Sequence, residues 1–95
     1  MYKVHDFSLS LENNIIIMNI NTCFIAKLDY NSDILLLLNW IIHPTITDHF
    51  IYGTQSFNLL AEKNKITFTT NICTLIFENN NIVRNEVRNF LDKYF

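Results

Sequence analysis

Clusters of Asn and Asp divide this 95-residue chain into short apolar segments, and this division constrains the fold more than any other feature. Asn and Asp favour turns because they tolerate left-handed backbone conformations and hydrogen-bond to their own backbone. The chain has a single Gly and a single Pro, so Asn and Asp supply most of the turn signals. Its length suits one hydrophobic core, and we expect a single domain over residues 1–95.

Several segments alternate between apolar and polar residues, which predicts half-buried β-strands. Phe7, Leu9 and Leu11 alternate with serines, for example. Other segments are rich in β-branched and aromatic residues, which favour strands because such side chains pack well on a pleated surface. The expected strands are residues 2–11, 15–28 (as one long strand or two short ones), 50–52, 55–61, 65–70 and 72–77, the last two forming a hairpin.

The segment 34–42 is apolar on nearly all sides, and its secondary structure is the main ambiguity. Leu is a good helix former and Ser32 could cap a short helix. A central strand covered on both faces has the same composition. The sequence favours the strand, with the helix as the alternative, and Pro44 ends the segment in either case.

The C-terminal segment has the spacing of an amphipathic helix. Its apolar positions recur at intervals of three and four residues, as on a helix that packs against a sheet. These positions are Val83, Val87, Phe90, Leu91 and Tyr94. We therefore predict an α+β fold, a mostly antiparallel sheet of about five to six strands covered by a C-terminal amphipathic helix.

Cys23 and Cys73 each lie within an apolar run, so we expect two buried thiols and no disulfide. The apolar runs are shorter than a membrane span. The N-terminal residues lack the apolar run of a secretory signal. These features predict a cytoplasmic protein that contacts no membrane.

Several enzyme classes are excluded by composition. A phosphate-binding P-loop, a dinucleotide fingerprint and a Gly-flanked serine elbow each need several glycines, and the chain has one. The His and Cys residues are scattered, without the spacing of a zinc site. We expect neither a cofactor nor a metal. The net charge of −2 and the few basic residues argue against direct binding of nucleic acid.

Residues 43–49 are the one local cluster with catalytic potential, because they contain two His, two Thr and Asp48. A His oriented by an Asp can act as a general base. No oxyanion hole accompanies them, so we expect binding or structural use of this segment. A small enzyme that uses His43 and His49 is the weakest of three hypotheses.

The leading hypothesis is a small protein that binds and inhibits another protein. An immunity protein that neutralises a toxin, such as a basic nuclease, and a phage-encoded inhibitor are examples. Tyr30 lies between two acids in a predicted loop, which is typical of interface anchors. The candidate partner-binding residues are Asp29, Tyr30, Asp33, Asp48, His49, Tyr52 and Glu62.

A homo-oligomeric scaffolding module is the alternative, in which a strand edge or the Leu-rich run pairs with a second copy. The sequence is compatible with a monomer or a homodimer.

Overall fold

The computed structural model describes residues 1–43, 50–53 and 57–95. The elements in chain order are β1 (Phe7–Glu12), β2 (Ile15–Ile20), β3 (Phe24–Asp29), α1 (Ser32–Ile42), β4 (Phe50–Gly53), β5 (Phe57–Ala61), β6 (Lys65–Thr70), β7 (Thr74–Glu78) and α2 (Asn81–Tyr94). In these residues, β1-β2-β3 form a three-stranded sheet and β4-β5-β6-β7 a four-stranded sheet, both antiparallel. The predicted α+β class, the antiparallel pairing and the C-terminal helix are confirmed.

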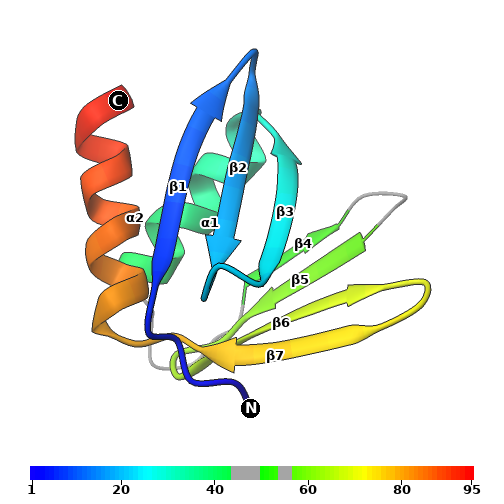
Figure 1. Cartoon of the computed structure of the whole chain (residues 1–95). Helices are drawn as coiled ribbons and strands as arrows, with labels where there is room; N and C mark the ends of the chain where they lie inside the picture. The colour runs from blue at the N-terminus through cyan, green and yellow to red at the C-terminus, as the bar shows by residue number, and fades with distance from the viewer. Residues whose placement is uncertain (44–49, 54–56) are drawn as a thin grey trace.

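The two sheets and two helices enclose one core (Figure 1). The first sheet rises from the second, α1 lies behind the first sheet, and α2 runs alongside β1. Helix α1 also packs against α2, β4 and β5. The largest fully buried side chains come from both sheets and both helices: Ile16, Leu28, Ile34, Leu37, Leu59, Phe77, Val83 and Val87.

Asn residues make the tight turns of the first sheet possible. Asn13 and Asn14 join β1 to β2 with φ of 50° and 63°, as in a type I′ hairpin turn. Asn21 and Thr22 follow β2 with φ of 54° and 58°. Asn adopts this left-handed region more readily than most residues. The second turn divides the predicted 15–28 segment into two strands, which was one of the two alternatives.

The preference for a strand over residues 34–42 was wrong, because this segment belongs to helix α1. Asn31, and not Ser32, caps the helix by accepting the N–H of Ile34 at 2.9 Å. The residues at 34, 37, 38 and 41 are buried, which is the spacing of one helix face. Leu36 is 56% exposed, and this outward leucine obscured the amphipathic pattern.

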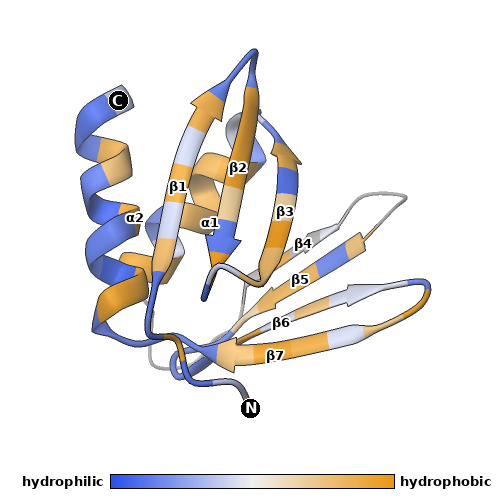
Figure 2. Cartoon of the chain, viewed as in Figure 1, coloured by the Kyte–Doolittle hydropathy of each residue, from blue (hydrophilic) through white to orange (hydrophobic). Residues whose placement is uncertain are grey.

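The C-terminal helix was predicted correctly. Asn80 caps it by accepting the N–H of Val83 at 3.1 Å. Val83, Val87 and Phe90 are buried, and the helix packs against β1 and α1. Figure 2 shows its hydrophilic residues on the side that faces away from the sheet.

The N-terminal residues leave the first sheet and run beside β7, so only the second half of the predicted 2–11 strand forms β1. Tyr2 makes a parallel bridge to Phe77. Its N–H donates to Ile76 O at 2.8 Å, and its carbonyl accepts from Glu78 N at 3.0 Å. This arm covers part of the β7 edge.

The expectation of two buried thiols was wrong, since Cys23 and Cys73 are both exposed and free. Each lies at a turn that could not be recognised within an apolar stretch of the sequence. Cys23 follows the left-handed pair between β2 and β3, and Cys73 follows Ile72, which is 92% exposed at the β6–β7 turn. An apolar residue at a hairpin tip therefore misled the burial prediction.

Candidate functional site

Tyr30 lies in the connection between β3 and α1, where its ring stacks on that of Phe95. The ring centroids are 5.4 Å apart and the planes are inclined by 3°. The Tyr30 N–H donates to Asn14 O at 3.0 Å, which holds the connection beside the β1–β2 turn. Tyr30 is 37% exposed and Phe95 is 54% exposed. The pair therefore presents a stacked aromatic surface to solvent.

Three exposed carboxylates belong to the strands and helix that adjoin the Tyr30 connection. Asp29 ends β3, and Asp33 lies in the first turn of α1. The register places Glu12 and Asp29 on either side of Ile15, on one face of the sheet. Among the described residues, none of the three carboxylates forms an ion pair. We name this set the acidic-aromatic surface: Glu12, Asp29, Tyr30, Asp33 and Phe95.

Two lysines lie close to this surface, but they do not reverse the sign of its net charge. Lys27 is on the same sheet face as Asp29, two residues earlier on β3. The Lys93 ammonium lies 5.2 Å from the centroid of the Tyr94 ring. Three carboxylates against these two ammonium groups leave the surface negative.

Glu62 was also predicted to bind the partner, but it is not part of this surface. It follows β5 at the turn beside the start of α2, whereas the β3–α1 connection lies at the other end of the molecule (Figure 1). Its Oε1 is 3.8 Å from Lys65 Nζ, and its N–H donates to Lys65 O at 2.8 Å. Arg84 Nη2 donates to the carbonyl of neighbouring Lys63 at 2.8 Å. The surroundings of Glu62 are thus basic, and the residue closes a turn.

The remaining predicted residues fall outside the described parts of the chain. Asp48 and His49 lie in the segment 44–49, which is not described. The backbone of Tyr52 belongs to β4, but its side chain lies outside the described residues. His43 is exposed directly after α1. The hypothesis of catalysis by residues 43–49 therefore stays a prediction.

Two further features of the described residues limit the kinds of site present. Within these ranges, no three or more His, Cys, Asp or Glu side chains come together as a metal site would require. Neither described helix is long and apolar enough to cross a membrane.

The acidic-aromatic surface is suited to recognising a guanidinium group. Arginine stacks on aromatic rings and donates paired hydrogen bonds to carboxylates. Asp29, Tyr30 and Asp33 were proposed from the sequence because they are close together along the chain, whereas Glu12 and Phe95 were not. Glu12 ends an alternating strand on its polar side, which is a readable signal. The contact of Phe95 with Tyr30 depends on the packing of α2 and has no local signal.

No protein-family model, curated protein or solved structure matches this chain.

Proposed function

We propose that this protein binds a basic protein and blocks it, as an immunity protein does with a toxic nuclease or a phage-encoded inhibitor does with its target. The observation that carries the proposal is the exposed, stacked Tyr30–Phe95 pair at the connection whose adjoining elements carry three carboxylates without an ion-pair partner among the described residues. Recognition, and not a chemical reaction, is the use that such a surface supports best.

The aromatic pair supplies the anchor of the proposed interface. Tyr is enriched among the residues that contribute most binding energy, because it buries a large area with few rotatable bonds. The two rings are already stacked, so little side-chain entropy remains to be lost when a partner binds. An arginine of the partner would lie over the exposed ring area and reach the carboxylates of Asp29 or Asp33.

Charge is distributed unevenly along the molecule, which would orient a partner. Glu12, Asp29 and Asp33 lie at one end, while Lys63, Lys65 and Arg84 outnumber Glu62 at the turn near the start of α2 (Figure 1). Surfaces of one sign steer a partner of opposite sign during diffusional encounter. A basic partner would therefore approach the acidic-aromatic surface first.

A photo-cross-linking amino acid at position 36 tests this proposal. Leu36 is 56% exposed and lies one turn after Asp33 on α1, so a partner on the acidic-aromatic surface should be within reach. We expect cross-linking to a basic protein in lysate of the source cell, and loss of that adduct when Tyr30→Ala is added.

Position 72 provides the matched control, since Ile72 is 92% exposed at the β6–β7 turn, outside the proposed interface. The same photoreactive residue there should give no adduct with the partner. Equal adducts from both positions, or an adduct at position 36 that persists after Tyr30→Ala, would count against the proposal.

A second candidate function, self-association, is favoured by Ile25. This residue is 59% exposed on β3, one of the two edge strands of the first sheet, and such edges can pair with a further strand. In the cross-linking experiment, an adduct that contains two copies of this chain would favour the scaffolding alternative.

A further inference from the structure

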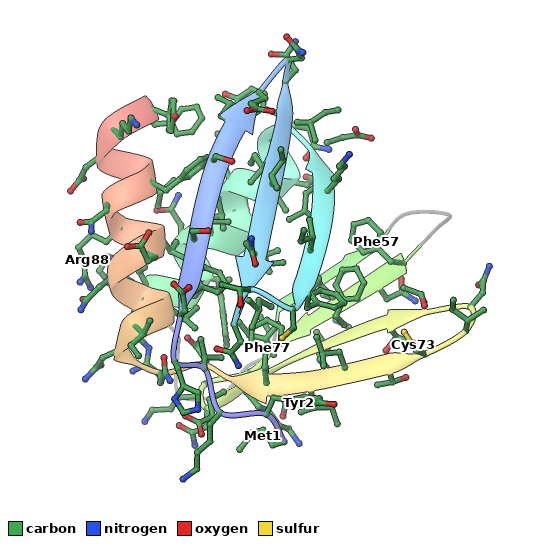
Figure 3. The ribbon with its side chains drawn as sticks, in the orientation of Figure 1. Met1, Tyr2, Phe57, Cys73, Phe77 and Arg88 are labelled. Atoms are coloured by element: carbon green, nitrogen blue, oxygen red, sulfur yellow. The ribbon has the colours of Figure 1, made fainter. Side chains whose placement is uncertain are left out.

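A pocket of about 280 Å³ opens where the two sheets diverge. Three aromatic residues form much of its wall: Tyr2 from the N-terminal arm, Phe24 from β3 and Phe77 from β7. Ile20 and Leu75 supply aliphatic walls. Figure 3 shows Phe77 directed into the space between the sheets and Tyr2 beside the same strand. The pocket therefore joins three segments that are far apart in the sequence.

Most of the walls of this pocket are held in place by the core or by backbone hydrogen bonds, and the Tyr2 side chain, which is 63% exposed, forms its outer wall. Phe77 and Ile20 are 0% and 3% exposed, so the core holds them. The Phe24 ring packs edge-on against Phe68, with centroids 5.3 Å apart. The backbone of Tyr2 is tied to β7 by its two hydrogen bonds. A preformed site avoids the ordering cost that weakens binding.

The amide of Asn21, the most polar side chain of the lining, already has hydrogen-bond partners within the protein. Asn21 Oδ1 accepts from the N–H groups of His5 and Asp6 at 2.8 and 3.1 Å, and Asn21 Nδ2 donates to Lys3 O at 2.8 Å. No charged side chain lines the described pocket. The groups left for a ligand are the Tyr2 hydroxyl and the Cys23 thiol. A charged ligand would lose its hydration here without gaining a partner of opposite sign.

We propose that this pocket binds a small neutral molecule with one apolar ring or two fused apolar rings. The volume exceeds that of a roughly 150 Å³ cavity known to accept benzene and lies just below the range of about 300–1,000 Å³ typical of larger ligands. Aromatic walls favour a flat ring, which they contact by stacking or edge-to-face packing. This site is separate from the acidic-aromatic surface, and the proposal does not depend on the proposed function.

The two exposed cysteines allow a direct test with the unmodified protein. Cys23 lines the pocket, whereas Cys73 lies at the far end of the β6–β7 hairpin (Figure 3). Iodoacetamide alkylation of each thiol is followed by mass spectrometry of its peptide, with and without indole. At about 90% occupancy, indole should slow alkylation of Cys23 about tenfold and leave Cys73 unchanged.

Indole-3-acetate is the matched probe, because it carries the same rings and a carboxylate. It should protect Cys23 at least about tenfold less well, since burying an unpaired carboxylate is costly. A Leu75→Trp variant, whose larger side chain occupies the pocket, should lose the protection by indole. Failure of indole to slow Cys23, or equal slowing of both cysteines, would overturn the proposal. Equal protection by the two probes would overturn the requirement for a neutral ligand.

Discussion

Replacing Phe77 with Ala is expected to lower the free energy of unfolding by about 3–5 kcal/mol. Phe77 is 0% exposed on β7 and belongs to the core that both sheets and both helices share. Removing its ring deletes buried apolar area and leaves a cavity that the fixed strands cannot fill. A domain of this length has a stability of about 5–15 kcal/mol, so this loss is a large part of the total. Urea denaturation followed by circular dichroism measures it.

The neighbouring residue on the same strand provides the control. Ile76 is 36% exposed on the opposite face of β7. An Ile76→Ala substitution should lower the stability by only about 1 kcal/mol, because its side chain keeps much of its contact with water. If the two variants were destabilised equally, Phe77 would not occupy the shared core described here.

Asn80→Ala should produce the second large loss of stability, about 2 kcal/mol. The side chain caps α2 through Oδ1, which is typically worth about 1 kcal/mol. Its Nδ2 also donates to Val4 O at 3.0 Å, and such a bond adds about 1 kcal/mol. One amide thus ties α2 to the N-terminal arm. Thermal and urea unfolding would both record the change.

Two further substitutions separate these contributions. Asn80→Ser keeps a capping oxygen but cannot reach Val4, so it should retain about half of the stability that Asn80→Ala loses. Asn81→Ala changes an exposed residue in the first turn of α2 and should have little effect. An Asn81→Ala loss as large as that of Asn80→Ala would contradict the assignment of the cap.

The elements that could be predicted from the sequence are those whose pattern is local. The strands around Phe7 and Lys65 were predicted from alternation and β-branched content, and α2 from its repeating apolar positions. Helix α1 could not be distinguished from a strand, because Leu35 to Leu38 are apolar on every side. Burial against two sheets and α2 decides which of these leucines face inward, and that information is not local.

The prediction that both cysteines are buried failed for a related physical reason. Hydrophobic neighbours suggested an interior position, but the turn at Asn21 and Thr22 places Cys23 at the surface. Thr is β-branched and seldom adopts positive φ, so the presence of Thr22 does not predict a turn. Its hydroxyl donates to Asn21 O at 2.6 Å. The position of Asn21 before it was the only local hint.

The candidate surface was predictable where it is continuous in sequence. Asp29 ends β3, Tyr30 lies in the connection and Asp33 lies in the first turn of α1, and the polar composition of residues 29–33 predicted their exposure. Glu12 and Phe95 join them through strand pairing and helix packing. Glu62 was included because an acid in a turn resembles a binding residue; it lies away from this surface and pairs with Lys65 three positions later. The pocket between the sheets has no sequence signal, since its walls come from three distant segments.

The salt dependence of affinity for the cross-linked partner is the most direct test of the claim that the acidic-aromatic surface recognises a basic protein. Between about 50 and 500 mM salt, wild-type affinity should fall about tenfold or more, because exposed charges are screened. The Asp29→Asn/Asp33→Asn variant should bind about tenfold more weakly at low salt and approach wild type at high salt. Asp6→Asn/Glu62→Gln removes two carboxylates at the other end of the molecule and should match wild type. Wild-type affinity in the Asp29→Asn/Asp33→Asn variant at low salt would contradict the account.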